Sequence, residues 1–206
     1  EIARGEDWRA VSRAAFGGTG SWGNGGAMRA APIGAWYAGD PVRAAAEGAT
    51  SAEPTHAHPE GIDGAAAVAA AAAFTAASGR EGTGSFDPDA FFSAVLDVLG
   101  PGRVREGIGK ARALGDVPAA RAAWSLGSGM AVAAFDTVPF CLWVAARHPF
   151  DYPAALRDAA CGIDRDTTCA IVGGIVVLSD TDGVPEAWAR VAEPLPDSLS
   201  GKFQGS

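Results

Sequence analysis

Residues 60–79, EGIDGAAAVAAAAAFTAASG, decide the class of fold. Alanine dominates this stretch, and alanine has the highest intrinsic helix propensity of the residues. The stretch ends at Gly79, a residue type that commonly follows the last turn of a helix. Its apolar run is shorter and richer in alanine than the run of about 18 residues expected of a membrane span. We therefore predict a long helix here and no membrane partner.

Further helices are predicted on either side of this stretch. Apolar spacing, Asp-Pro starts and glycine stops favour helices at residues 4–16, 87–100, 130–149 and 151–162, the third being bent at Pro139. Residues 170–180, AIVGGIVVLSD, are ambiguous, because their β-branched content also suits a strand. A lone strand would have no partner, so we predict a helix there too. The prediction is an all-α protein with one domain over residues 1–206, a loop at 80–86 and a flexible tail at 195–206.

Composition excludes some classes of function. The 206 residues carry a formal net charge of -8 and a pI near 4.8. Such an acidic surface argues against general nucleic-acid binding, which needs a basic face for the phosphates. The three cysteines have no CxxC spacing, and we expect buried, reduced thiols in a cytoplasmic protein.

An acidic cluster in CGIDRDTTC is the first candidate site. Asp164, Asp166 and Thr167 place two carboxylates and a hydroxyl within four residues. These hard oxygen ligands suit Mg²⁺, Mn²⁺ or Ca²⁺ better than zinc. The alternative is a helix N-terminus in which the same side chains cap free N–H groups. A second acidic group, SDTDG at residues 179–183, is interpreted as a surface turn.

Two histidines in EPTHAHPEG form the second candidate. His56 and His58 could bind a transition metal, but no further His or Cys pattern accompanies them. The following Pro-Glu is typical of the entry to the alanine helix. One histidine that donates a hydrogen bond to a ligand, and a structural role for both, remain open.

Two glycine-rich segments complete the candidates. Backbone N–H groups in residues 17–25, GGTGSWGNG, could bind phosphate oxygens, and Phe16 and Trp22 could sandwich a flat base. Residues 126–139, LGSGMAVAAFDTVP, form another glycine-rich turn before an apolar segment. Tight connections between helices explain both segments equally well.

Taken in order, four segments resemble the ADP-ribosylglycohydrolase family. They are FGGTGSWGNGGAMRAAPIG, THAHPEGIDGA, LGSGMAVAAFDTVP and GIDRDTTCAIVGG, and the resemblance extends to about Pro194. It implies an orthogonal all-α bundle with two Mg²⁺, or Mn²⁺, at the bottom of an ADP-ribose cleft. The family's late metal motif is G-G-D-x-D-T, so Asp164, Asp166 and Thr167 carry over as ligands. Ile163 stands where the family has a second glycine.

The resemblance also assigns the binding residues. Ser21, Gly23, Asn24 and Gly25 would contact the diphosphate and its ribose, and His56 would donate to a phosphate. Phe16 and Trp22 would stack on the adenine. Ser128, Gly129 and Met130 match the turn that lines the adenosine side.

One departure from the family affects the predicted activity. The family carries an early G-D-A-x-G segment and an Asp-Asp motif with the remaining metal ligands, and these 206 residues contain neither. The chain therefore resembles the family without its N-terminal portion, which a separate segment could supply in trans. Its catalytic residues are expected there, and we expect the isolated chain to be inactive. The predicted function of the intact protein is Mg²⁺-dependent hydrolysis of the bond between ADP-ribose and a protein side chain or small conjugate. The alternative is a non-catalytic ADP-ribose binder or a crystallin-like structural protein.

Overall fold

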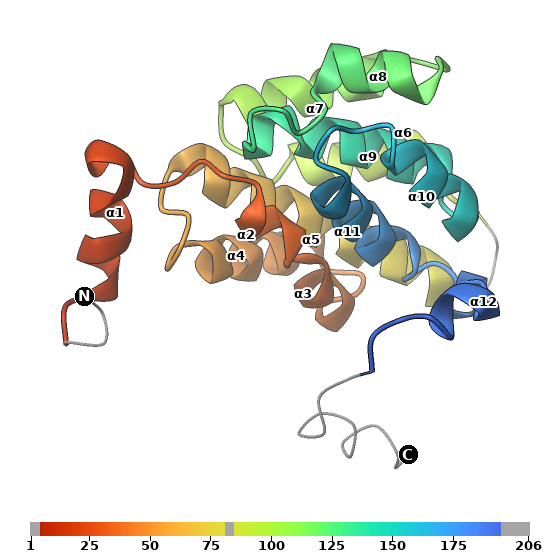
Figure 1. Ribbon diagram of the computed structural model, residues 1–206, viewed down its shortest axis with the longest axis horizontal. Coiled ribbons are helices and arrows are strands. Elements are labelled where there is room, and N and C mark those ends of the chain that lie inside the picture. Colours follow the sequence, from red (N-terminus) through yellow and green to blue (C-terminus); the bar gives the residue numbers. More distant parts are fainter. Residues whose placement is uncertain (1–4, 81–84, 195–206) are drawn as a thin grey trace.

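A computed structural model describes residues 5–80 and 85–194, and the regular elements among them are helices (Figure 1). The all-α prediction is confirmed. In chain order the helices are α1 (Trp8–Gly18), α2 (Gly25–Met28), α3 (Ala31–Trp36), α4 (Pro41–Ala52), α5 (Pro59–Arg80), α6 (Pro88–Leu96), α7 (Arg103–Ala113), α8 (Ala119–Leu126), η2 (Ala134–Asp136), α9 (Val138–Arg147), α10 (Tyr152–Ala159), α11 (Arg165–Val176), η3 (Thr181–Gly183) and α12 (Glu186–Ala189).

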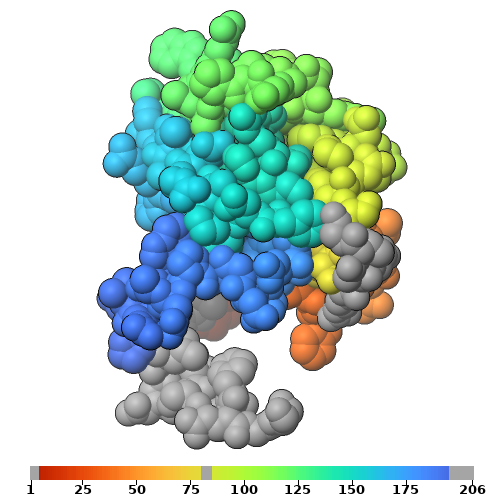
Figure 2. Space-filling model, turned by 90° about the vertical axis from the view of Figure 1, so that its right-hand side faces the viewer, coloured from red at the N-terminus to blue at the C-terminus, as the bar shows by residue number. Residues whose placement is uncertain are grey.

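The alanine helix α5 is the axis of the core. Its residues 65–73 are all buried, so the helix is covered on every side. Helices α2, α3 and α4 pack on one side of it, and α6, α9 and α11 pack on the others (Figure 1). Figure 2 looks onto the face formed by α9, α10 and α11, with α12 at its lower edge. Larger apolar side chains, among them Phe91, Phe140 and Ile171, fill the space around α5.

Small residues let the helices approach α5 closely. A Cβ atom on Gly34 of α3 would lie 2.3 Å from the carbonyl oxygen of Ala69 and 2.4 Å from the Cβ of Ala72. A Cβ on Gly48 of α4 would lie 2.8 Å from the Cβ of Ala69. Real side-chain atoms cannot occupy such positions without moving the backbone. Alanine on α5 and glycine on its partners therefore set the spacing of this side of the bundle.

Helix α5 is long and apolar enough to meet the length and composition criteria for a membrane span. This differs from our expectation that the stretch is too short, because the helix extends over 22 residues rather than the apolar run alone. Most of it is enclosed, however, since 72% of its apolar window is buried inside the protein. Such burial is typical of a helix in the core of a folded domain.

Two predicted helix boundaries were wrong by five residues or more. Residues 130–149 are not one bent helix, because α9 begins at Val138 and Pro139 lies in its first turn, where a missing N–H costs nothing. The residues before it form a turn and the short η2 element. Helix α11 begins at Arg165, five residues before the predicted start, with Asp164 at its N-cap position.

Other expectations have mixed outcomes. All three cysteines are free thiols, but of these Cys141 is buried, Cys169 is partly buried and Cys161 is exposed. The group at 179–183 is a turn, as predicted, in which Asp180 accepts a hydrogen bond from the Asp182 N–H. The tail at 195–206 and most of the loop at 80–86 lie outside the described residues.

Candidate functional site

The glycine-rich loop after α1 crosses the molecule and pairs with the turn before α9. Trp22 O accepts a hydrogen bond from the N–H of Ala134 at 2.9 Å, and the N–H of Asn24 donates to Val132 O at 3.3 Å. Both segments were predicted as candidates, and the structure brings them together. Backbone hydrogen bonds therefore join the two segments directly.

A cavity of about 430 Å³ opens beside this pairing. That volume is within the range of small-molecule sites. Seven of its lining residues are those that the resemblance assigns to ADP-ribose, and two more come from the paired turn. The lining residues are Phe16, Ser21, Trp22, Gly23, Asn24, Gly25, His56, Ala131 and Val132. Residues far apart in the sequence therefore form one concave surface.

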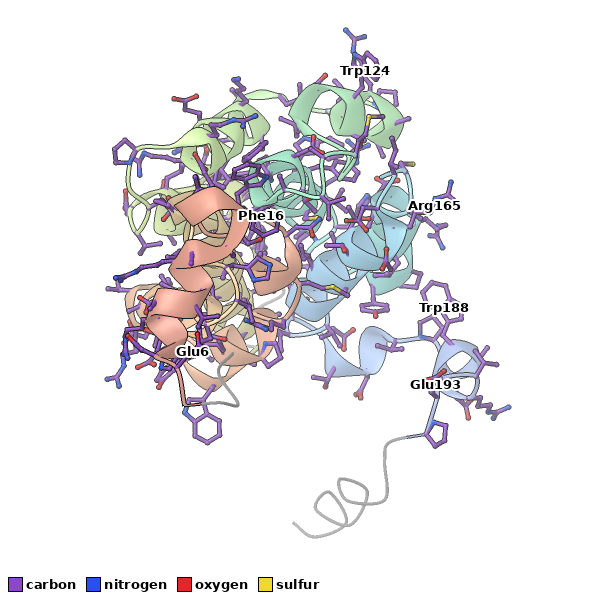
Figure 3. The ribbon with its side chains drawn as sticks, turned by 60° about the vertical axis from the view of Figure 1, so that its left-hand side comes forward. Glu6, Phe16, Trp124, Arg165, Trp188 and Glu193 are labelled. Atoms are coloured by element: carbon purple, nitrogen blue, oxygen red, sulfur yellow. The ribbon has the colours of Figure 1, made fainter. Side chains whose placement is uncertain are left out.

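An aromatic pair stands at the edge of the cavity. The ring centroids of Phe16 and Trp22 are 6.3 Å apart, with an angle of 32° between the planes. The two rings already contact each other at this spacing, so a flat ligand would stack on an open face rather than between them. Phe16 is 69% exposed and Trp22 is 41% exposed, which leaves such faces free. In Figure 3, Phe16 lies at the end of α1 nearest the bundle.

The backbone at Phe16 is strained. Its φ is +54°, a conformation that bulky residues rarely adopt. Helix α1 is broken there, since residues 15–17 lack helical angles. Strained residues of this kind concentrate at functional sites, where the surrounding structure holds them in place. The strain supports a role for this exposed ring in binding.

His56 and His58 lie close in sequence but contact different groups. The Nε2 atom of His56 lies 3.2 Å from the position that a Cβ on Gly23 would take. His58 instead accepts a hydrogen bond from the N–H of Glu60 at 3.1 Å and packs edge-on against Trp22. His58 is therefore structural. Within residues 5–80 and 85–194, no group of three His, Cys, Asp or Glu side chains is arranged to hold a metal, so a histidine metal site lacks a third ligand there.

Asn24 joins the loop to the acidic cluster. Its side-chain amide donates to Asp164 Oδ2 at 2.7 Å and to the Thr137 hydroxyl at 3.0 Å. The Thr137 hydroxyl donates in turn to Ala133 O at 3.0 Å. Asn24 is 3% exposed, and both hydrogens of its amide are engaged within the protein. Sequence reasoning missed Thr137, although it lies in the motif AFDTVP.

Asp164, Asp166 and Thr167 lie together at the N-terminus of α11, with Asp164 partly buried, Asp166 exposed and Thr167 buried. Burial acts to raise the pKa of Asp164, but hydrogen bonds with Asn24, Asp166 and Thr167 outweigh it and hold the pKa below its ordinary value. The carboxylate is therefore the stable form. Arg165 between the acids is exposed and projects outward (Figure 3).

The turn at residues 128–130 contacts the acidic cluster and is not part of the cavity lining. Ser128 O accepts hydrogen bonds from the N–H groups of Ile163 at 2.7 Å and Asp164 at 3.3 Å. Gly129 has a φ of +84°, and a Cβ there would lie 2.4 Å from the Cβ of Asp164. Met130 is 68% exposed. The turn thus holds the backbone of Asp164 in place through these hydrogen bonds and the close approach of Gly129.

Comparison with protein families agrees with this geometry. A family model described as ADP-ribosylglycohydrolase matches residues 2–204. The chain belongs to the ADP-ribosylglycohydrolase family. Its all-α architecture is that of an ADP-ribosylglycohydrolase, and membership places it in a class of hydrolases that act on ADP-ribosylated substrates. Comparison with curated protein sequences found no match to this chain.

Proposed function

We propose that this ADP-ribosylglycohydrolase binds ADP-ribose in the cavity beside the glycine-rich loop. It would hydrolyse the bond between ADP-ribose and a protein side chain or small conjugate with the help of Mg²⁺. The observation that carries the proposal is the link between the cavity and the acidic cluster: Asn24 lines the cavity and donates to the Asp164 carboxylate. A ligand in the cavity would therefore extend toward the carboxylates.

The cavity offers a suitable surface for each part of the ligand. The open faces of Phe16 and Trp22 would stack on the adenine, as base-stacking aromatic rings commonly do. Loop residues Ser21, Gly23 and Gly25 bring the backbone close to the diphosphate, and His56 would donate to a phosphate oxygen. Asn24 is assigned a different role from the one that the resemblance implies. Its amide hydrogens serve Asp164 and Thr137, so it positions the carboxylate.

The acidic cluster offers the type of ligand atom that Mg²⁺ prefers. Asp164, Asp166 and Thr167 offer oxygen atoms, and the two carboxylates stand two residues apart at the start of α11, so a cation bound near them would offset their like charges. Mg²⁺ is commonly held by one or two carboxylates, with water and substrate completing its shell. When bound, the metal would supply charge stabilisation and an activated water. Three ligands cannot fill the shells of two ions, so we expect weak metal binding by these residues alone.

Hydrolysis would build positive charge on the ribose as the glycosidic bond breaks. The chain's own contribution to that step would be to hold the ADP-ribose in one position and to keep Asp164 ionised. Correct positioning lowers the barrier by removing the cost of bringing the groups together. Asn24 and the turn at Gly129 would therefore act by fixing the carboxylate against the bound sugar.

Calorimetric titration with ADP-ribose, together with chromatographic detection of ADP-ribose released from ADP-ribosylated arginine and serine peptides, tests the proposal. We expect the chain to bind ADP-ribose and Trp22→Ala to bind it less tightly. Trp124→Ala is the matched control, because Trp124 is 88% exposed on α8, away from the cavity. Equal binding by both variants, or no binding by the parent chain, would contradict the proposal. Binding with fast Mg²⁺-dependent release would instead contradict two expectations, namely that the isolated chain is inactive and that it binds the metal weakly.

A further inference from the structure

Three side chains form a hydrogen-bonded chain behind the cavity. Arg29 Nη2, just after α2, donates to the Thr55 hydroxyl at 2.7 Å. The Thr55 hydroxyl lies 2.8 Å from Nδ1 of His56. The same Arg29 nitrogen also donates to Ser51 O at 3.0 Å, which fixes the guanidinium against the end of α4. The sequence motifs assign a role to His56 but none to Arg29 or Thr55.

The direction of the bond between Thr55 and His56 follows from counting hydrogens. The Thr55 hydroxyl has one hydrogen, which can go to Ala52 O at 3.3 Å or to Nδ1 of His56 at 2.8 Å. Ala52 O already accepts from the backbone N–H groups of Thr55 at 3.0 Å and His56 at 2.8 Å. A carbonyl oxygen has two lone pairs, and both are taken. The hydroxyl hydrogen therefore goes to Nδ1, which must be an acceptor.

If Nδ1 of His56 accepts a hydrogen bond, the protonation of Nε2 in the neutral ring follows. In a neutral imidazole one nitrogen accepts and the other carries the hydrogen. We propose that Arg29 and Thr55 are positioning residues that hold the His56 ring with its hydrogen on Nε2, directed at the glycine-rich loop as a donor for a phosphate oxygen. Nε2 lies 3.2 Å and 3.3 Å from the positions that Cβ atoms on Gly23 and Gly25 would take. Glycine at these two positions leaves Nε2 uncovered.

The positive charge of Arg29 also favours the neutral form of the His56 ring. Burial, and then the positive charge of Arg29, lower the pKa of His56, so the ring stays neutral. The opposite tautomer would present a lone pair at Nε2 and repel an anionic ligand. The choice of phosphate as ligand rests on the proposed function, whereas the tautomer rests only on the hydrogen bonds described above.

Nitrogen-15 NMR of the histidine rings tests the tautomer in the protein without ligand. We expect His56 to show an unprotonated Nδ1 and a protonated Nε2 near neutral pH. Thr55→Val removes the donor and should give a mixture of tautomers, whereas Thr55→Ser keeps the hydroxyl and should preserve the pattern. Thr50→Val is the matched control on α4, since the Thr50 hydroxyl donates to Ala46 O and does not contact His56. A protonated Nδ1 in the parent chain, or an unchanged ring in Thr55→Val, would overturn the proposal.

Titration of the same proteins with ADP-ribose separates this inference from the proposed function. We expect Thr55→Val to weaken ADP-ribose binding roughly 3- to 10-fold, the range that one hydrogen bond carries, and Thr55→Ser and Thr50→Val to bind as the parent does. Thermal melting of each variant checks that it is folded. If the parent chain has the expected tautomer but does not bind ADP-ribose, the proposed function fails and the positioning of His56 stands. If Thr55→Val shifts the tautomer but binds normally, the donor role of Nε2 toward the ligand is overturned.

Discussion

Asn24 Nδ2 and Asp164 Oδ2 lie 2.7 Å apart, although 140 positions separate the two residues in the chain. Asn24 belongs to the loop that lines the cavity, and Asp164 precedes α11. The hydrogen bond is charge-assisted, since Asp164 is held in its ionised form. This hydrogen bond thus connects the binding loop directly to the acidic cluster.

Replacing Asn24 should destabilise the protein. Asn24→Ala leaves the Asp164 carboxylate and the Thr137 hydroxyl without their shared donor. We expect a loss of about 1–3 kcal/mol in the free energy of unfolding, measured by urea denaturation. Thr137→Val should lose less than Asn24→Ala, and Thr137→Ser should stay near the parent. A change below about 0.5 kcal/mol for Asn24→Ala, which is usual for surface substitutions, would contradict the role of this bond.

The turn at Gly129 should not tolerate a side chain. Gly129→Ala places a Cβ 2.4 Å from the Cβ of Asp164 at a φ of +84°, so we expect a loss of about 1–3 kcal/mol or more in stability. Gly109→Ala is the matched control, because no atom of the described residues lies within 4 Å of its Cβ position in α7. That change should stabilise the protein by about 0.5–1 kcal/mol. Similar melting temperatures for the two variants would show that Gly129 is not constrained.

His56 should make stability depend on pH. Burial and Arg29 lower its pKa in the folded protein below the ordinary 6.5. The unfolded chain therefore takes up a proton first as the pH falls. The stabilising contribution is fully present above the unfolded value and is lost as the pH falls through the folded value.

Urea denaturation between about pH 7.5 and about pH 5, which brackets the ordinary histidine pKa, measures this effect. The parent should lose more unfolding free energy over that interval than His56→Gln. Arg29→Met should lie between them, because it removes the Coulombic part of the shift. Parallel curves for the parent and His56→Gln would argue against the lowered pKa.

The two acidic groups should differ in metal binding. Asp164→Asn removes a carboxylate from the cluster at α11, and we expect the affinity for Mn²⁺ to fall by at least about 10-fold, since even outer-shell losses cost that much. Asp182→Asn alters the turn at η3 and should leave the affinity unchanged. Electron paramagnetic resonance of free Mn²⁺ measures both. Equal weakening by the two variants would locate the metal elsewhere or indicate non-specific binding.

Local sequence signals explain which helices could be predicted. Helices α5 and α6 follow directly from an alanine run and an Asp-Pro start. Helix α4 carries the same Asp-Pro signature, at Asp40 and Pro41, and could have been predicted from it. The start of α9 was misplaced because an apolar run cannot show that the Asp136 carboxylate accepts the Ala131 N–H at 2.7 Å and stabilises a turn there.

Most residues of the cavity lining could be named from the sequence, but their hydrogen bonds could not. The resemblance assigned seven residues that line one cavity, because motif order reflects a shared fold. It did not indicate that the Asn24 amide donates to Asp164 within the protein. It also did not indicate that Arg29 contacts Thr55, or that Thr55 contacts His56. Such hydrogen bonds depend on how distant segments meet, and no local pattern encodes that meeting.

The alanine helix at the centre of the protein limits how the site could adapt to another ligand. Methyl groups have no rotamers to rearrange, and Gly34 and Gly48 leave no free space between α5 and its neighbours. A change of specificity during evolution would therefore have to come from the connecting loops, where Phe16 and Val132 already adopt left-handed conformations. Laboratory selection for a different nucleotide should accumulate substitutions around these two residues and spare α5.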